Sequence, residues 1–453
     1  MAIQVVILAA GQGTRMQSNL PKVLHPLAGK SLLEHVISTA AKLDPAVSPM
    51  VICGHQSQLL REALSKYPIS WVEQKEQLGT GHALQQALPL IKGDRVLVLY
   101  GDVPLISETT LKRLIDTTPA NAIGMLTAEL QNPAGYGRIK RDLEENIIGI
   151  VEEKDATEQE RTIQEVNPGI YVIPMQLLNK WLPSLKNNNA QKEYYLTDVI
   201  SFAVNENITI HDVQPTSIEE IFGINDRVQL SRLERHYQQE QAEKYMRQGV
   251  TIIDPKRFDV RGEAIIGRDV TIDVNVILEG KVSIGDGCII GANSILRDTQ
   301  LGERVEVKAH TLIEGATIAA DCIIGPFARI RPGTVLAAQA HIGNFVEIKQ
   351  SSIGEKSKIN HLSYVGDSVI GKRVNVGAGT ITCNYDGAHK HKTTIGDDVH
   401  IGSDTQLVAP VTVGEGATIA AGSTVTKDVS PHELTLTHHL EQRTKAGWKR
   451  PVK

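Results

Sequence analysis

The sequence predicts an α/β domain of Rossmann-like type, then a connecting α-helix, and then a parallel β-helix built from hexapeptide repeats. Three observations predict this order. Apolar runs alternate with helical patterns up to about residue 226, a polar segment without Gly or Pro follows, and aliphatic residues recur at every sixth position from Ile266 to Val425. The predicted parts are residues 1–226, the linker helix 227–249, the β-helix 250–429 and a C-terminal arm 430–453.

The six-residue period is the strongest signal in the chain. Helices repeat at about 3.6 residues and strands at about 2, so a period of six fits one side of a triangular coil. Stacked coils of about 18 residues would be filled by one aliphatic residue per side. The repeating positions, called anchors here, are Ile266, Ile272, Leu278, Ile284, Ile290, Leu296, Leu301, Val307, Ile313, Ile318, Ile324, Ile330, Leu336, Ile342, Ile348, Ile353, Ile359, Val365, Ile370, Val376, Ile395, Ile401, Leu407, Val413, Ile419 and Val425.

The first 226 residues show no such rhythm. Apolar runs at 5–10 and 96–100 are typical of buried strands, and 32–43 has the pattern of a helix. This alternation predicts a parallel sheet covered by helices on both faces. The next helix is expected over 227–248, with Asn225 or Asp226 as its N-cap and Gly249 at its end.

Composition excludes several classes of protein. A formal net charge of −5 argues against a nucleic-acid-binding protein, which normally has a basic bias. The four cysteines lie far apart without a CxxC pair, which favours buried thiols in a reducing compartment over disulfides or a zinc site. No apolar run of about 18 residues and no secretory leader are present, so we expect a soluble, cytoplasmic protein with no membrane span.

A glycine-rich string, LAAGQGTRM (8–16), directly follows the first predicted strand, and PKVL (21–24) comes soon after. Glycine lets backbone N–H groups approach a nucleotide closely, and Arg15 and Lys22 supply cations for a polyphosphate. The alternative for a GxG alone is a plain turn with solvated charges. Because no GK[ST] is present, the string differs from a Walker loop.

The second strand ends in an acid, in the string VLVLYGD (96–102). Asp102 would then lie at the carboxyl end of a parallel strand, where open α/β sheets bind ligands. Beside phosphates, its carboxylate would coordinate Mg²⁺, a hard cation that prefers oxygen ligands. The alternative is an aspartate that caps a helix or a turn.

Two departures mark a site on the β-helix. The step from Ile381 to Ile395 is fourteen residues, so the polar excess at 384–392 predicts a loop that leaves a corner of the coil. In addition, Arg331 and Lys349 each directly follow an anchor one coil apart. Two cations about 5 Å apart repel each other unless an anion such as phosphate joins them.

A histidine lies on the same coils. His361 comes two residues after its anchor, as Asn344 and Ala378 do after theirs, so these three residues should form one column with His361 one coil from both neighbours. A surface or hydrogen-bonded histidine is the alternative. Near a paired cationic site and a protruding loop, however, the position favours a role in catalysis.

The strings LAAGxGTRMxxxxPKxL (8–24), QLGTGHA (77–83) and YGDVPL (100–105) resemble those of a bacterial enzyme family, the bifunctional glucosamine-1-phosphate N-acetyltransferase/N-acetylglucosamine-1-phosphate uridylyltransferases. The resemblance runs nearly end to end. It implies acetyl transfer from acetyl-CoA to the amine of glucosamine-1-phosphate in the C-terminal domain. It further implies uridylyl transfer from UTP in a nucleotidyltransferase N-terminal domain, giving UDP-N-acetylglucosamine and pyrophosphate. It also implies a left-handed β-helix and a homotrimer.

The resemblance assigns roles at the N-terminal site. Lys22 and Arg15 would hold the triphosphate and assist catalysis, and Asp102 with Asn225 would bind Mg²⁺. The sugar would be read by Gly137, Glu152 and Asn167. The full set for UTP and UDP-N-acetylglucosamine is Leu8, Ala9, Ala10, Gly11, Lys22, Gln74, Gly79, Thr80, Tyr100, Gly101, Asp102, Gly137, Glu152, Asn167 and Asn225.

The resemblance also assigns roles at the C-terminal site. His361 would act as the general base on the sugar amine, a role that typically contributes about 10²- to 10⁴-fold in rate. A backbone N–H near Ala378 could stabilise the oxyanion. Glucosamine-1-phosphate would bind Arg331, Lys349, Tyr364, Asn375 and Lys390, and acetyl-CoA would bind Ala378, Asn384, Tyr385, Ser403, Ala421 and His438.

One departure from the family pattern concerns coenzyme A. The family often has an arginine after the β-helix that contacts the CoA phosphates, where this chain has His438 and His439. Because histidine is only partly charged at neutral pH, this contact should be weaker or pH-dependent.

Two other functions fit parts of the pattern. The β-helix could be a trimerising or allosteric scaffold behind a sugar nucleotidyltransferase, or the chain could be a regulatory subunit similar to those of the eukaryotic initiation-factor exchange complex. The first is disfavoured by His361, the cation pair and the interrupted repeat. The second would not need GxGTRM, Lys22 and Asp102 beside an acetyl-transfer site.

Overall fold

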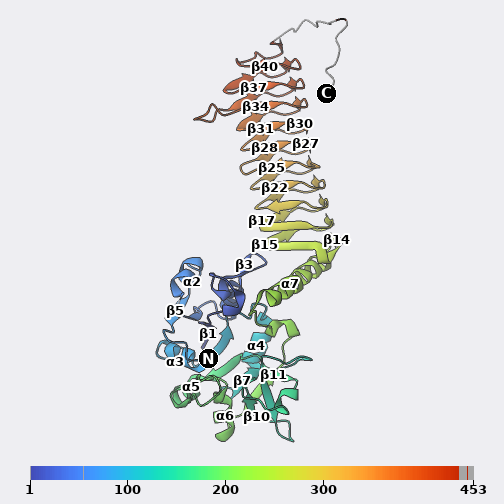
Figure 1. Cartoon of the computed structure of the whole chain (residues 1–453). Helices are drawn as coiled ribbons and strands as arrows, with labels where there is room; N and C mark the ends of the chain where they lie inside the picture. The colour runs from blue at the N-terminus through green and yellow to red at the C-terminus, as the bar shows by residue number, and fades with distance from the viewer. Residues whose placement is uncertain (1, 55, 438–445, 447–453) are drawn as a thin grey trace. The chain divides into compact units, whose positions relative to one another are not determined.

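The computed structural model describes residues 2–54, 56–437 and 446, and it contains two compact units, Met1–Tyr237 and Gln238–Lys453 (Figure 1). The division falls inside helix α7 (Arg227–Arg247). The predicted domain boundaries at 226, 249 and 429 stay predictions. None of the helices in the described ranges is long and apolar enough to cross a membrane.

The first unit is built on a seven-stranded sheet in the order β13-β7-β12-β6-β1-β4-β5. Side chains of the central strand β1 alternate between two cores, with Val6 and Leu8 on one face and Val5 and Ile7 on the other. Both faces are therefore buried, as predicted. The strands are β1 Ile3–Ala9, β4 Met50–Cys53, β5 Ser70–Glu73, β6 Arg95–Tyr100, β7 Ile123–Leu126, β12 Tyr171–Pro174 and β13 Ile210–Val213.

Helices contribute to both cores. Helix α1 begins after Ser31, whose hydroxyl accepts from the N–H of Glu34 while the Glu34 carboxylate accepts from the N–H of Ser31. Its bounds, Leu32–Leu43, match the predicted range. Helices α1, α2 and α4 contribute side chains to one core, and α3, α5 and α6 contribute to the other. The remaining bounds are α2 Ser57–Ala63, α3 Thr80–Ala87, α4 Glu108–Thr117, α5 Met175–Trp181 and α6 Asp198–Asn205.

The predicted parallel sheet has one exception, because β12 runs antiparallel to both β6 and β7. The chain leaves β7, builds a second sheet and returns as β12 without a helical crossover, so its direction reverses. This second, four-stranded sheet has the order β10-β9-β11-β8. Its strands are β8 Ala128–Glu129, β9 Gly137–Arg141, β10 Ile147–Val151 and β11 Glu165–Asn167.

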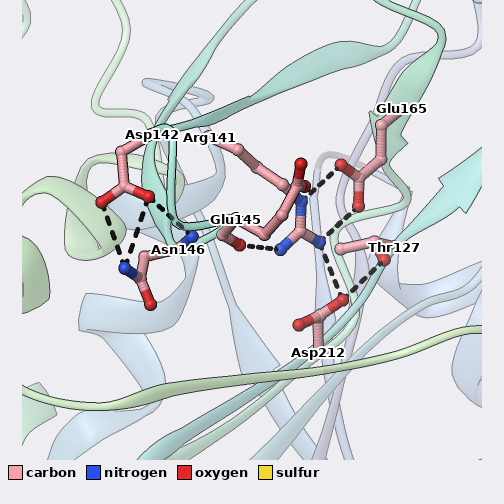
Figure 2. Close-up of polar contacts among 7 residues, drawn as sticks. All are labelled: Thr127, Arg141, Asp142, Glu145, Asn146, Glu165 and Asp212. Carbon is pink, nitrogen blue, oxygen red and sulfur yellow. Dashed lines mark hydrogen bonds and ion pairs between the residues drawn. The ribbon is translucent and has the colours of Figure 1, made fainter.

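Arg141 joins the two sheets of the first unit (Figure 2). Its guanidinium donates twice to Glu165 on β11, at 2.8 and 2.6 Å, and once to Asp212 on β13, at 2.8 Å. A third donor reaches the carbonyl oxygen of Glu145, at 2.7 Å. The two carboxylates raise the pKa of Arg141. Arg141 thereby ties the four-stranded sheet to the edge of the larger one.

Replacing Arg141 by Met should destabilise the first unit by about 1–3 kcal/mol, because two facing carboxylates lose their shared cation at a site that is only 20 % exposed. Urea unfolding measures the loss. The matched control is Lys112→Met, which removes an exposed i,i+4 pair with Glu108 and should change the urea midpoint far less. Equal losses of stability in the two variants would contradict the conclusion that Arg141 ties the two sheets together.

Helix α7 begins as predicted after Asp226, whose carboxylate accepts from the N–H groups of Val228 and Gln229. Its end is marked by Gly249, which has φ +98° and donates to the carbonyl oxygen of Met246. In the first unit, Leu233 packs in a small core. In the second unit, Ala242 and Tyr245 belong to the core of the β-helix.

The second unit is a parallel β-helix, as predicted. One side is an eleven-stranded parallel sheet of β14 Thr251–Ile252, β16 Thr271–Ile272, β18 Ile289–Ile290, β21 Glu306–Val307, β24 Ile323–Ile324, β27 His341–Asn344, β30 Lys358–His361, β33 Asn375–Val376, β36 His400–Ile401, β39 Thr418–Ile419 and β41 Leu434–Thr435. The stack therefore starts before Ile266 and continues past Val425, into the segment predicted as an arm.

The other sides form a seventeen-stranded sheet. Its strands are β15 Phe258–Ile266, β17 Val276–Ile284, β19 Ile295–Arg297, β20 Gln300–Leu301, β22 Leu312–Glu314, β23 Thr317–Ile318, β25 Arg329–Ile330, β26 Val335–Leu336, β28 Glu347–Lys349, β29 Ser352–Ile353, β31 Tyr364–Gly366, β32 Ser368–Ile370, β34 Ile381–Cys383, β35 Thr393–Ile395, β37 Gln406–Val408, β38 Val411–Val413 and β40 Thr424–Val425.

The predicted anchors fill the interior of the coil. All of them are buried except Ile266, which packs partly buried against the same core. Glycines that follow anchors are needed for close approach between coils, since a Cβ at Gly285 would lie 2.6 Å from the carbonyl carbon of Gly302. Thr382 takes the anchor position that the sequence pattern missed; it is buried, pairs with Leu407 and accepts from the N–H of Gly366.

Candidate active sites

The glycine-rich loop follows β1 and sets the position of Lys22. Gly13 has φ +63°, and a Cβ there would lie 2.5 Å from the Cβ of Lys22. A residue other than glycine would therefore push Lys22 away. Lys22 opens a short 3₁₀ helix, η2 (Lys22–Leu24), and its side chain is only 12 % exposed.

Lys22, Asp102 and Asn225, which the resemblance assigns to one site, lie close together. The Nζ of Lys22 lies 2.5 Å from Oδ2 of Asp102 and 3.1 Å from Oδ1 of Asn225. Asp102 also accepts, through its backbone carbonyl, the N–H of Ile224 at 2.9 Å, which holds the Asn225 segment beside the end of β6. A carboxylate oxygen and an amide oxygen thus face the same cation.

A cavity of about 520 Å³ adjoins this cluster. Gln74 is buried in its wall, where its amide donates to the carbonyl oxygen of Gly79 at 3.1 Å. Gly79 itself has φ +107°, and a Cβ there would lie 2.7 Å from the carbonyl oxygen of Tyr194. The lining includes ten of the predicted residues, Leu8, Ala9, Ala10, Gly11, Lys22, Gln74, Gly79, Thr80, Tyr100 and Asp102.

The three residues assigned to the sugar form a second group. Gly137 on β9 is directly opposite Asn167 on β11, and a Cβ at Gly137 would lie 3.5 Å from Oε2 of Glu152. Oε1 of Glu152 accepts from the hydroxyl of Thr197 at 2.9 Å. Tyr100 belongs to both groups, since it lines the cavity and its pKa is raised by burial and by the charges of Glu152 and Asp102.

Two predicted residues lie apart from these groups. Arg15 is exposed on the 3₁₀ helix η1 (Thr14–Met16) and is not among the residues that line the cavity. Gly101 is buried against Ala9, Leu33 and Val23, where a Cβ would be 3.2 Å from the nearest atoms, so it shapes the wall behind Asp102.

Burial raises the pKa of Glu152 above its ordinary value near 4.5. The folded protein therefore binds this proton more readily than the unfolded chain, and ionised Glu152 lowers stability as pH rises from about 4.5. Replacing Glu152 by Gln should raise the Tm of the first unit at pH 7, and the gain should disappear at pH 4. Thermal unfolding at both pH values tests this, and an equal gain at pH 4 and pH 7 would contradict it.

His361 lies in the predicted column on the β-helix. It is exposed, pairs with Asn344 in the register of β27 and β30, and its backbone oxygen accepts from the N–H of Gly379. Its Nδ1 lies 3.0 Å from Oδ1 of Asn344. Because an amide oxygen can only accept, Nδ1 is the donor in this pair, and in the neutral imidazole Nε2 is then the acceptor.

The predicted cation pair is present, with a third cation beside it. The N–H of Arg331 donates to the carbonyl oxygen of Ile348, which stacks Arg331 next to Lys349. The nearby Lys390, then desolvation and Arg331, lower the pKa of Lys349. Glu347 partly balances the cluster through a 2.7 Å ion pair with Arg331. The cluster favours an anion.

Lys390 comes from the predicted loop between β34 and β35. The loop folds back as a small hairpin, in which Tyr385 pairs antiparallel with Lys390. Asp386 accepts from the N–H groups of Ala388 and His389 and from Nε2 of His391, and these bonds lower its pKa. At the base of the loop, Asn384 donates to Asp367 at 2.5 Å. The loop thus places Lys390 by its own hydrogen bonds.

Three of the residues assigned to acetyl-CoA extend the His361 column. Ala378, Ser403 and Ala421 follow one another on successive coils, since the carbonyl oxygen of Ala378 accepts from Asp404 and that of Ser403 from Gly422. The two other residues assigned to glucosamine-1-phosphate lie on the same coils. In the strand register, Tyr364 is opposite Glu347 and Asn375 is opposite Lys358. His438 and His439 lie outside the described residues.

Sequence reasoning missed several residues around these sites. Thr197 and Tyr171, beside Glu152 and Asn167, belong to no glycine-rich or charged string. Gln12 and Gln77 lie within the recognised strings, but only the structure shows that both line the cavity and that the Gln12 amide donates to Oε1 of Gln77 at 2.8 Å. Because each glutamine lies in a motif assigned to the nucleotide site, the sequence could have suggested that both line the cavity.

Comparisons with known proteins identify the domain types of the chain. Family models match residues 5–163 (MobA-like NTP transferase domain), 260–343 (GMPPB C-terminal domain) and 392–427 (bacterial transferase hexapeptide, six repeats). The chain is 55 % identical over 452 residues to "Bifunctional protein GlmU" of Azoarcus sp. (strain BH72), covering 100 % of each. The chain belongs to the GlmU family. The family is bifunctional, with uridylyltransferase and acetyltransferase activities.

Solved structures similar to part of the chain include apo UDP-glucose pyrophosphorylase, 17 % identical with TM-score 0.43 over 53 % of this chain and 100 % of that one. A nucleotidyl transferase from Methanothermobacter thermautotroptrophicus is 20 % identical, with TM-score 0.39 over 52 % of this chain and 97 % of that one. The GlmU assignment rests on the full-length relative and the two matched domain types.

Proposed function

We propose that the two sites described above carry the two activities of the GlmU family on one amino sugar. The β-helix site acetylates the amine of glucosamine-1-phosphate with acetyl-CoA. The site in the first unit then joins N-acetylglucosamine-1-phosphate to the uridylyl group of UTP, giving UDP-N-acetylglucosamine and pyrophosphate. The observation that best supports this proposal is that each unit has its own group of assigned residues close together. In the first unit these are Lys22, Asp102 and Asn225. In the second unit, the His361 column lies beside a cationic cluster.

In acetyl transfer, the sugar phosphate binds the cluster of Arg331, Lys349 and Lys390, where the lowered pKa of Lys349 reflects crowded positive charge. The amine attacks the thioester carbonyl, the C–S bond breaks, and CoA leaves as a thiolate that takes the proton back from the imidazolium. Nε2 of His361 takes the proton from the amine, since Asn344 holds Nδ1 in the protonated form. Ala378, Ser403 and Ala421 form the flank along which the coenzyme lies.

In uridylyl transfer, a phosphate oxygen of the sugar attacks the α-phosphorus of UTP, and the bond to the β-phosphate oxygen breaks. Positioning and charge neutralisation supply most of the catalysis in such transfers. The backbone of the glycine-rich loop approaches the nucleotide, Lys22 neutralises its phosphates, and Gln74 and Gly79 form the wall that holds the base. Arg15, exposed on η1, meets the outer phosphates once the nucleotide is bound.

The oxygens of Asp102 and Asn225 fit Mg²⁺. They face one point, at which Lys22 places its ammonium group, and one carboxylate with one amide oxygen suits an ion that keeps several waters. Bound Mg²⁺ would neutralise charge on the phosphates. In its presence, Lys22 would turn from Asp102 to the nucleotide.

One assay tests both halves of the proposal. The protein is given glucosamine-1-phosphate, acetyl-CoA, UTP and Mg²⁺, and free thiol and pyrophosphate are followed separately. We expect thiol release without UTP, and pyrophosphate release without acetyl-CoA when N-acetylglucosamine-1-phosphate is supplied. A protein that releases pyrophosphate but never thiol would support the scaffold alternative for the β-helix.

We also propose that the protein works as a homotrimer in the cytoplasm. Apolar side chains beside the His361 column are unusually exposed for one chain, at 49 % for Phe327, 56 % for Phe345 and 63 % for Leu362. Four free cysteines suit a reducing compartment. Sedimentation equilibrium should give three times the chain mass, and Phe345→Asp should lower it. A parent protein that stays monomeric at micromolar concentration would refute the trimer.

A further inference from the structure

Tyr171 lies on β12, a strand in the middle of the seven-stranded sheet, with Val98 and Met125 as its neighbours across the sheet. The side chain is 0 % exposed and belongs to the core on the α3 side. Its hydroxyl makes no hydrogen bond to any residue that the structure describes. A buried hydroxyl without a partner costs stability, so a phenylalanine would suit this position better as core.

Tyr171 packs in the same core as Tyr100, which lines the nucleotide cavity. Burial, then the charges of Tyr100 and Glu152, raise the pKa of Tyr171, and the nearby Asn167 amide lowers it, although that contact does not meet hydrogen-bond geometry. Within the described residues, the Tyr171 hydroxyl is thus a fully buried polar group of this core without a hydrogen bond.

The side-chain amide of Asn167 has an NH₂ group that can donate to a ligand. Its Oδ1 accepts from the N–H of Gly169 at 3.0 Å, which fixes the orientation of the amide and leaves the NH₂ group to donate. Asn167 itself is only 7 % exposed, so its NH₂ group has little access to solvent. A small rotation of the amide would give one N–H to the Tyr171 hydroxyl and direct the other at a ligand.

We propose that Tyr171 is a positioning residue for the amino-sugar phosphate, whose hydroxyl accepts from Asn167 when the sugar binds and so aims the second N–H of Asn167 at the sugar. This inference rests on the proposed uridylyl-transfer function of the site. It assigns to Tyr171 a role in sugar affinity and in no other step: the nucleotide cavity is lined by other residues, and Tyr171 is absent from it.

The test is Tyr171→Phe in the full-length protein, which removes the hydroxyl and keeps the ring. We expect the KM for N-acetylglucosamine-1-phosphate to rise about tenfold, with the KM for UTP changed less than about twofold. Thiol release at the other unit should be unchanged. The Tm should equal or exceed that of the parent, because no existing hydrogen bond is lost.

The matched control is Tyr67→Phe, in the same unit. The Tyr67 hydroxyl donates to Oε1 of Glu34 at 2.9 Å, so this change should lower the Tm and leave both KM values unaltered. An unchanged sugar KM in Tyr171→Phe, or equal rises in the sugar and UTP KM values, would overturn the inference. Failure of the proposed function is distinguishable, since the parent protein would then release no pyrophosphate at all.

Discussion

Replacing Asp102 by Asn should lower pyrophosphate release by about 10³-fold and leave thiol release unchanged. Asparagine keeps the shape of the side chain but removes the charge that faces Lys22 at 2.5 Å and that would hold Mg²⁺. Loss of one preorganised charge at a phosphoryl-transfer site typically costs about 10²- to 10³-fold, and here cation binding is lost with it. The rate of pyrophosphate release from UTP and N-acetylglucosamine-1-phosphate measures the effect.

A Mg²⁺ titration separates this explanation from a general loss of structure. The half-saturating Mg²⁺ concentration should rise in Asp102→Asn, while the Tm stays close to that of the parent. Asp116→Asn, at an exposed position on α4, is the control and should behave like the parent. Loss of thiol release in the Asp102 variant would show that the two sites are not independent.

Replacing His361 by Gln should affect the other activity, lowering thiol release and leaving pyrophosphate release unchanged. Glutamine can still donate to Asn344 but cannot accept the proton of the amine, so thiol release should fall by about 10²- to 10⁴-fold. Pyrophosphate release from supplied N-acetylglucosamine-1-phosphate should not change. Both rates are measured on the same preparation, so each site controls for the concentration and integrity of the other.

Two further measurements sharpen the interpretation of the His361 variant. His310→Gln, at another coil of the same unit where the ring stacks on Phe327, should leave thiol release within about twofold, since it holds no catalytic proton. For His361→Gln, the KM values for both substrates should be nearly constant while kcat falls, as expected for a group that acts in the transition state. A large rise in either KM with kcat unchanged would point to a binding role instead.

The period of six predicted the second unit in detail, because one buried side chain per side of the coil fixes the register of every neighbour. That register placed Arg331 beside Lys349 and His361 beside Asn344, as the structure confirms. It failed at Thr382, where a hydroxyl satisfied by the N–H of Gly366 occupies an aliphatic position. Periodicity in hydrophobicity cannot detect a buried polar residue whose partner is backbone.

The first unit was predicted less completely. The strands at 5–10 and 96–100 and helix α1 followed from local patterns, and parallel-strand geometry placed Asp102 at the carboxyl end of its strand. The direct contact between Lys22 and Asp102 was not predicted. The four-stranded sheet and the reversal of β12 did not, because they depend on pairing between segments with no local signature. The ion pair of Arg141 with Asp212 and the burial of the Tyr171 hydroxyl also depend on packing between distant segments, which composition and spacing do not reveal.

The register of the β-helix also constrains how such a chain can change in length. Removing a full turn, such as the seventeen residues that separate Ile290 from its partner position Val307, would return every later side chain to its original side. Removing a single residue would instead rotate all following positions, burying polar groups and exposing aliphatic ones. Insertions and deletions upstream of the catalytic histidine should therefore be tolerated in whole turns, or as loops at the corners.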